Sequence, residues 1–367
     1  MIAQVKRTIG VYGMLTEGSL SLELVGSVLA EDVFAKNKSI PLLRKGTILN
    51  ERHIFVLQSH LHHNNLRLET CFINQPSISV EKLEQNYKES LGQLKMIFED
   101  LEATINGSAS NQPLQKLEHM YTPMLNTIVA EDEHFELLKL LRKDDEFTYV
   151  HSLNVAVVSS IIGKLLKMDK AEILLLGETG ILHDIGKLAI PLSVLKKNGK
   201  LDPEEWELIR NHTVEGVQIL KKMGETRSKV IMGTLMHHER IDGSGYPYRV
   251  REDVIPLHAQ IISVADTYDA ITAVRPYKGE QSPIVAVMIL MEETAKRKFD
   301  SAITVPFTKY LMDQFVGKRV VLNTGEQGTI ITVYEDRPHC PLVHLGDNHY
   351  VDLRYDGTRS LKDVVSY

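Results

Sequence analysis

The stretches ILHDIGK, residues 181–187, and HHERIDGSGYP, residues 237–247, lie in a region whose apolar residues recur at helical spacing. Strand signals are almost absent between residues 145 and 316, so this region is predicted to be an all-α domain. The sequence Asp202-Pro203-Glu204-Glu205 is a strong helix start, because the Asp caps free amides and the acids lie near the positive helix end. The expected helices span 148–167, 170–186, 203–222, 226–238, 257–273, 281–296 and 303–315.

The regions on either side have different patterns. Residues 1–75 are expected to form a small mixed α/β module, with a helical run over 51–61 and a final strand. Residues 317–367 contain β-branched runs separated by tight-turn sequences, which predict three or four antiparallel strands. This small β appendage shows no catalytic constellation.

Residues 76–140 are expected to be a helical linker region. A charged amphipathic helix is predicted over 79–105, then a break at 106–113, then a second helix that continues to about residue 141 and is disturbed at Pro123. Two interpretations stay open. The helices are either a connector with one buried stripe or a coil that pairs with a second copy, which would make a homodimer.

Composition narrows the class of protein. The chain has 367 residues, 43% hydrophobic, with a formal charge of −6, which is a globular make-up without the basic face of a DNA- or RNA-binding protein. Cys71 and Cys340 are far apart and in no motif, which argues against a disulfide scaffold or a thiolate metal site. No signal peptide is recognised, and the most apolar stretch, 154–166, is too short for a membrane span, so we expect a soluble cytoplasmic protein.

Histidine is the one unusual count, with 15 in the chain. Nitrogen and carboxylate donors without thiolate suit iron, manganese or zinc. Five His and two Asp in the helical region are too many for one ion but suit two ions bridged by a carboxylate, an arrangement that clamps a phosphate. Lys187 falls one helical turn after the HD pair, within reach of a phosphate oxygen. The candidate donors are His151, His183, Asp184, His212, His237, His238 and Asp266.

The two quoted stretches resemble the signatures of the HD-GYP family of cyclic di-GMP phosphodiesterases, a branch of the HD metallophosphohydrolases. The resemblance covers about residues 141–316 and implies an HD-type helical metal-binding domain with two divalent ions, iron or manganese by family likeness. It implies that His151, His183, Asp184 and Asp266 hold one ion. It implies that His212, His237 and His238 hold the other, with Asp184 bridging.

The resemblance also implies the reaction. A hydroxide activated by the two metals would hydrolyse cyclic di-GMP to pGpG, and further cleavage to GMP stays open. Asp184 and Lys187 would be catalytic, with Lys187 also binding the scissile phosphate. Tyr246 would line the pocket, and Arg275 with Lys278 would form a basic pair that binds the ligand.

One position departs from the pattern of some relatives. A third metal in these relatives uses a Glu four residues before the first His, where this chain has Phe147, and the acids at 144–146 are out of register by at least one residue. We therefore expect two metals. Glu239 and Asp242 are expected to orient metal-bound groups or to shape the loop rather than to bind an ion.

Two other functions are weighed against hydrolysis of cyclic di-GMP. A receptor would hold the ligand and signal with little turnover, but it would not need the full set of metal donors. An HD hydrolase of another nucleotide phosphoester would not need the complete GYP loop.

Overall fold

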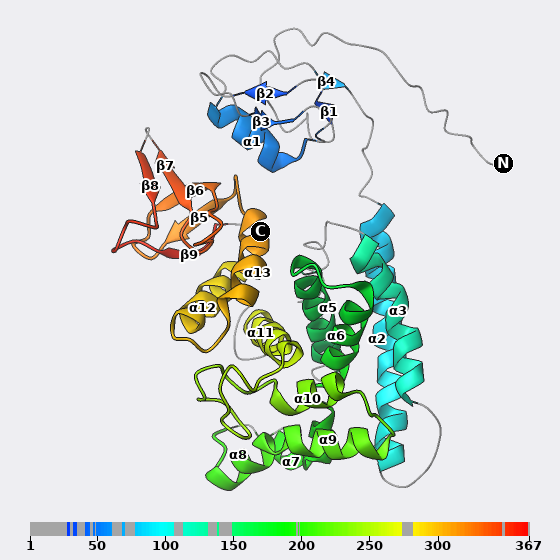
Figure 1. Ribbon diagram of the computed structural model, residues 1–367. Coiled ribbons are helices and arrows are strands. Elements are labelled where there is room, and N and C mark those ends of the chain that lie inside the picture. The colour runs from blue at the N-terminus through cyan, green and yellow to red at the C-terminus, as the bar shows by residue number, and fades with distance from the viewer. Residues whose placement is uncertain are drawn as a thin grey trace, which may run out of the picture.

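The computed structural model describes residues 28–29, 32–34, 41–44, 47, 49–60, 68–69, 78–105, 113–130, 138, 149–195, 197, 199–273, 282–346 and 349–365. Helices form the body of the molecule, and the strands lie beyond one end of it (Figure 1). This arrangement confirms a mainly α protein. The central elements are α5 (Tyr149–Leu165), α6 (Lys170–Leu182), the short 3₁₀ helix η2 (Ile185–Ala189), α7 (Leu192–Leu195), α8 (Pro203–Arg210), α9 (His212–Lys222), α10 (Ser228–Met236), α11 (Leu257–Thr272), α12 (Pro283–Ala295) and α13 (Ser301–Asp313).

Two of the predicted helices are interrupted. The helix expected over 170–186 ends at Leu182, and the HD pair lies between it and η2. The helix expected over 203–222 breaks at Asn211, which ends α8 and begins α9. A helical period continues through such breaks, so the sequence pattern does not reveal them. Both breaks lie beside candidate metal donors.

Helix α5 is the centre of the helical core. Its residues from Leu153 to Gly163 are all buried, because α6 and α11 pack along it. A helix that is apolar on every side is stable only when neighbours surround it. The core therefore positions α5 and α11 next to each other, and each of them carries one candidate donor.

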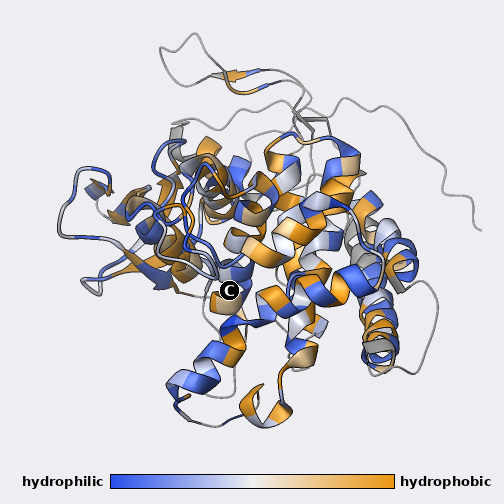
Figure 2. Ribbon diagram, turned by 60° about the horizontal axis from the view of Figure 1, so that its bottom comes forward, coloured by the Kyte–Doolittle hydropathy of each residue, from blue (hydrophilic) through white to orange (hydrophobic). Residues whose placement is uncertain are grey.

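The helices α2 (Ile78–Ile105) and α3 (Pro113–Ala130) form a hairpin that packs against α5 and α6 (Figure 1). The predicted stripe on α2 is buried, as Tyr87, Leu94 and Leu101 show, and Pro123 lies inside α3. Both hydrophobic and hydrophilic residues occur around these helices (Figure 2), as expected of helices with one buried face. The hairpin therefore shares the core of the helical domain.

The described part of the N-terminal region holds two small antiparallel strand pairs and one helix. β1 (Val28–Leu29) pairs with β4 (Leu68–Glu69), and β2 (Val33–Phe34) pairs with β3 (Pro41–Leu43). α1 (Glu51–His60) lies between β3 and β4 in the chain, and its Arg52 contacts Asp313 of α13 at 3.3 Å. Cys71 lies outside the described residues.

The C-terminal region forms one antiparallel sheet of five strands in the order β8-β7-β6-β5-β9. Three or four strands were predicted. The extra strand is the short, half-polar LKDV segment, which pairs with the edge of β5. The strands are β5 (Arg319–Leu322), β6 (Gln327–Thr332), β7 (Leu342–Gly346), β8 (His349–Asp352) and β9 (Leu361–Val364). Across the described residues, every helix is too short or too polar to cross a membrane.

Candidate metal centre

Most of the candidate donors lie where helices end. His183 follows the last residue of α6, His212 is the first residue of α9, and His237 follows the last residue of α10. His151 and Asp266 instead lie within α5 and α11. The structure brings all seven predicted donors together in two neighbouring groups. We call these the His151 group (His151, His183 and Asp266) and the His212 group (Asp184, His212, His237 and His238).

Three of the histidines are oriented by the backbone just before them. The Nδ1 atom of each lies within hydrogen-bond distance of the carbonyl three residues earlier: Gly180 for His183 at 2.6 Å, Ile209 for His212 at 2.5 Å and Thr234 for His237 at 2.9 Å. Carbonyls in the last turn of a helix lack helical partners, so they are available acceptors. With Nδ1–H donating, each Nε2 keeps its lone pair for a metal.

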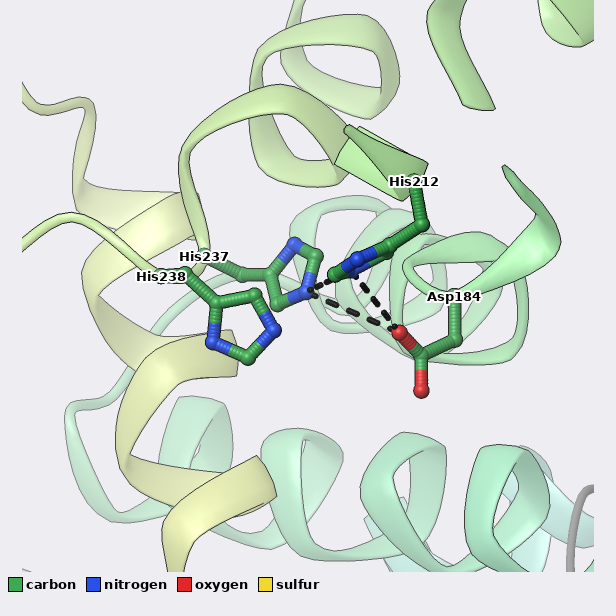
Figure 3. A group of neighbouring side chains, drawn as sticks. All are labelled: Asp184, His212, His237 and His238. Atoms are coloured by element: carbon green, nitrogen blue, oxygen red, sulfur yellow. Dashed lines mark hydrogen bonds and ion pairs between the residues drawn. The ribbon is translucent and has the colours of Figure 1, made fainter. Parts of the chain in front are cut away.

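Asp184 lies between the two groups. Its Oδ1 atom is 3.2 Å from Nε2 of His212 and 3.8 Å from Nε2 of His237 (Figure 3). Its Oδ2 atom is 3.4 Å from Nε2 of His151 and 3.3 Å from Nε2 of His183. Each oxygen of this carboxylate therefore faces a different group.

The donor set fits divalent cations. Within each group the ligand atoms lie within 4.8 Å of one another. Nε2 of His183 and Oδ1 of Asp184 are buried and receive no hydrogen bond, and the Nε2 atoms of His212 and His237 face each other at 3.4 Å. Buried polar atoms without partners cost free energy, and two facing lone pairs repel each other. A cation between these atoms would give the buried atoms a partner and remove the repulsion between the lone pairs, so this buried His/Asp cluster could bind metal.

The charges in the centre favour the metal-binding forms of most donors. Burial raises the pKa of the Asp184 and Asp266 carboxyls, but nearby positive charge outweighs burial and holds both well below the usual range. For Asp184 this comes from Lys187, His183 and His151, and for Asp266 from His151, His238 and His183. Burial lowers the pKa of His238 to about 3 and that of His237 well below its usual range. These carboxylates are therefore ionised and these imidazoles neutral at neutral pH.

His151 differs from the other histidines. Burial lowers its pKa, but hydrogen bonds with Asp184, Asp266 and Asp269 outweigh this and raise it well above the usual range. Its Nδ1 atom lies 2.7 Å from Oδ2 of Asp269, a partner 118 residues away. Asp269 was not among the predicted site residues. A signal was present, because Asp269 follows Asp266 by three residues and so lies on the same face of the helix.

Comparison with known proteins agrees with this geometry. Residues 125–303 match the HD domain family. A cyclic di-GMP phosphodiesterase of Pseudomonas aeruginosa is 36% identical over 191 residues, 52% of this chain and 46% of the relative. A cyclic di-GMP phosphodiesterase of Thermotoga maritima is 34% identical over 187 residues, 49% of this chain and 50% of the relative.

The match with the HD domain family and the names of these two relatives place residues 125–303 beside the HD-type phosphodiesterases in sequence. A solved HDG"Y"P protein from Bdellovibrio bacteriovorus has the same fold, with a TM-score of 0.53 at 18% identity, covering 78% of this chain and 94% of the other. The chain spans about half the length of the first two of these relatives.

The HD stretch of the chain is shaped by close packing. A Cβ atom on Gly186 would lie 1.8 Å from the carbonyl oxygen of His212, so only glycine lets η2 approach the start of α9. The next residue, Lys187, contacts Oδ2 of Asp184 with its ammonium group. The predicted catalytic pair is thus in direct contact.

The GYP loop is held by one buried carboxylate and by a tight backbone fold. Oε1 of Glu239 accepts hydrogen bonds from the backbone amides of Tyr248 and Arg249 at 2.7 and 2.9 Å, which fits the expected role in shaping the loop. A Cβ atom on Gly245 would lie 2.4 Å from Cα of Glu239, so the loop folds back too tightly for any other residue. Oδ1 of Asp242 accepts from the amide of Ser244 at 2.9 Å, and its side chain is exposed.

Tyr246 reaches the metal donors from this loop. Its ring stacks on His238 with centroids 4.6 Å apart and planes 25° apart. Burial and the carboxylates of Asp184 and Asp266 raise the pKa of its hydroxyl, which stays protonated. The guanidinium of Arg210 lies 5.9 Å from the centre of the ring, on the exposed end of α8. Sequence analysis missed Arg210, although it stands two residues before a predicted donor.

Three of the sequence predictions concern residues that the structure does not describe. Arg275 and Lys278, the expected basic pair, lie outside the described residues, and so does Phe147. Their roles stay predictions.

Proposed function

We propose that this chain is a metal-dependent phosphodiesterase that hydrolyses cyclic di-GMP to pGpG. The observation that carries the proposal is the meeting of seven metal donors in two groups with Asp184 between them. The names of the relatives from Pseudomonas aeruginosa and Thermotoga maritima support the substrate. Hydrolysis, rather than binding alone, explains why a complete donor set is retained.

In this proposal His151, His183, Asp184 and Asp266 hold one ion. A second ion is held by His212, His237 and His238, with Asp184 shared between the two. When bound, two such ions supply Lewis acidity at a phosphate and lower the pKa of water. Iron or manganese suits nitrogen and carboxylate donors without thiolate. We propose two ions rather than three because Phe147 offers no donor atom.

The chain's own residues would bind and orient the dinucleotide. The Lys187 ammonium, already beside the Asp184 carboxylate, would bind a phosphate oxygen and offset the charge that develops during cleavage. The Tyr246 ring offers an aromatic face for a purine base at the edge of the centre. Arg210, Arg275 and Lys278 would supply positive charge for the second phosphate or a guanine edge.

A second substrate has a specific observation in its favour. A relative from Vibrio cholerae, named a 3′3′-cGAMP-specific phosphodiesterase, is 37% identical over 162 residues, 44% of this chain and 35% of the relative. The second candidate is therefore 3′3′-cGAMP, which offers the same phosphodiester chemistry with one adenine in place of a guanine.

The test uses the full chain, loaded with Fe²⁺ without oxygen or with Mn²⁺. It compares cyclic di-GMP, 3′3′-cGAMP, pGpG and an unrelated nucleoside triphosphate, with Asp184→Asn as the inactive control. We expect cyclic di-GMP to give pGpG, and incubation with pGpG decides whether GMP follows. Tight binding of cyclic di-GMP without turnover would make the protein a receptor. Turnover of the triphosphate alone would make it an HD hydrolase of another class.

We also propose the homodimer expected through residues 76–140. The buried stripe of α2 faces α3 and α5 of its own chain, so pairing would use the outer faces, where Met96 is 67% exposed. Light scattering during gel filtration measures the mass of the assembly directly. A monomer at all concentrations contradicts this part of the proposal. The division into modules at residues 75, 140 and 316 likewise stays a prediction.

A further inference from the structure

We propose that Tyr87, in the N-terminal helix hairpin, is a positioning residue for the His151 group of the metal centre. The inference rests on the proposed metal binding by that group, and it assigns to α2 a role beyond packing. Tyr87 acts through Asn154 and Asp269.

Three hydrogen bonds link Tyr87 to the metal centre. The Tyr87 hydroxyl donates to Oδ1 of Asn154 at 2.8 Å, and Nδ2 of Asn154 donates to Oδ1 of Asp269 at 2.8 Å. Oδ2 of Asp269 accepts from Nδ1 of His151 at 2.7 Å. The Nε2 atom of His151 is then directed at Asp184 and Asp266, 3.4 and 3.3 Å away.

This series of hydrogen bonds allows only one orientation of the Asn154 side-chain amide. The Asn154 amide presents its NH₂ group to an oxygen of Asp269 and its own oxygen to Tyr87, and the reverse orientation would bring two oxygens face to face. The Tyr87 hydroxyl is the donor that makes this orientation favourable. Without that donor, the Asn154 oxygen loses the 2.8 Å hydrogen bond from Tyr87, and the amide that contacts the Asp269 carboxylate is held less firmly.

Burial makes these bonds difficult to replace. Tyr87, Asn154 and Asp269 have 3%, 1% and 4% of their surface exposed, so bulk water does not reach them. The three residues come from α2, α5 and α11, which meet only in the folded core. Groups that contact a metal ligand in this way fix its orientation, and their loss weakens metal binding about 10- to 100-fold.

The same hairpin offers a matched control. Tyr121 of α3 is fully buried, and its hydroxyl also bonds to α5, at the Ala156 carbonyl (3.0 Å) and the Ser160 hydroxyl (2.8 Å). Neither of these two bonds leads to a metal donor. Tyr121→Phe therefore removes a comparable buried hydroxyl but leaves the hydrogen bonds that connect Tyr87 to His151 intact.

The experiment titrates the metal-free full chain with Mn²⁺ by calorimetry and follows hydrolysis of cyclic di-GMP. Tyr87→Phe keeps the ring and is expected to weaken one of the two Mn²⁺ sites about three- to tenfold, less than removal of a direct partner. Excess Mn²⁺ should restore kcat with KM for cyclic di-GMP unchanged. Tyr121→Phe should bind Mn²⁺ as the wild type does, even if its Tm falls as far.

Asn154→Leu is the second variant, and it keeps the test valid if Tyr87→Phe folds poorly. It removes the hydrogen bonds of Asn154 to Tyr87 and to Asp269. We expect Mn²⁺ to bind about 10- to 100-fold more weakly at the same site. Equal Mn²⁺ affinities in Tyr87→Phe and Tyr121→Phe, or wild-type affinity in Asn154→Leu, overturn the inference. A wild type that binds two Mn²⁺ ions but leaves cyclic di-GMP intact overturns only the proposed reaction. A wild type that binds no Mn²⁺ overturns both.

Discussion

The His212 group and the His151 group face the same carboxylate, Asp184, but they are built in different ways. His212 and His237 are oriented by carbonyls three residues earlier in the chain. His151 is oriented by Asp269, which lies 118 residues away, and through it by Asn154. The oriented histidines of the His212 group thus depend on local helix ends, whereas the His151 group combines one such histidine, His183, with one held by the packing of distant helices.

The difference also extends to charge. Burial holds the pKa of His237 and His238 below the usual value, whereas three carboxylates raise that of His151. The locally built group is therefore ready to bind a cation at neutral pH, while His151 must first release a proton. A side-chain substitution can disturb the support of the His151 group, but the backbone supports of the His212 group offer no side chain to change.

The largest effect is expected from Asp184→Asn, which changes the residue common to both groups. Both ions should be lost and hydrolysis of cyclic di-GMP should fall below detection, because each carboxylate oxygen faces a different set of histidines. Metal analysis and a turnover assay measure this, with Asp336→Asn, an exposed change in the C-terminal β region, as the control. Two ions per chain with normal turnover in Asp184→Asn would refute the shared position.

A more selective effect is expected from Asp269→Asn. This change removes the negative charge that holds Nδ1–H of His151, so the ion of the His151 group should bind about 10- to 100-fold more weakly. The ion of the His212 group should be unaffected. Calorimetric titration with Mn²⁺ separates the two sites. Equal weakening of both would show that the two groups do not differ in their support.

The metal-free protein should reveal the difference in charge through its stability. The folded pKa of His238, about 3, lies below the unfolded value of about 6.5, so its contribution to stability is lost as pH falls below 6.5. The folded pKa of His151 is raised, so its contribution is present below about pH 6.5 and is lost as pH rises through the folded value. Each histidine contributes at most about 1.4 kcal/mol per pH unit.

Thermal unfolding of the metal-free protein in a chelator, between about pH 5 and pH 8, tests the direction of both pH dependences. His238→Gln should flatten the acid side of the stability profile, and His151→Gln the alkaline side. If both variants flatten the same side, the assigned directions of the two pKa shifts are wrong.

The smallest effects are expected outside both groups. Arg210→Ala, Arg275→Ala and Lys278→Ala should each raise KM for cyclic di-GMP, by up to about tenfold for the loss of one charged hydrogen bond, while both ions stay bound. Lys221→Ala, an exposed change on α9, is the control. An unchanged KM in Arg275→Ala and Lys278→Ala would identify these residues as ordinary solvated cations.

Much of this architecture is present in local sequence. The helical period predicted the helices of the centre, and Asp202 caps its helix as expected, with Oδ1 accepting from the Glu205 amide at 2.8 Å. The HDIGK and HHERIDGSGYP stretches predicted four of the seven donors, His183, Asp184, His237 and His238, because a motif states residue type and spacing directly. The tight packing at Gly186 and Gly245 is also encoded there, since no other residue fits.

Other features depend on contacts between distant segments. The break at Asn211, which orients His212, is invisible to a helical period that continues across it. The strand Leu361–Val364 forms because the edge of β5 is free to pair with it. The support of His151 by Asp269, Asn154 and Tyr87 exists only when α2, α5 and α11 pack together. The sequence thus determined which groups could bind metal, through patterns a few residues long. Tertiary structure alone decided how His151 is held, because its partners are far apart in the chain and meet only in the folded core.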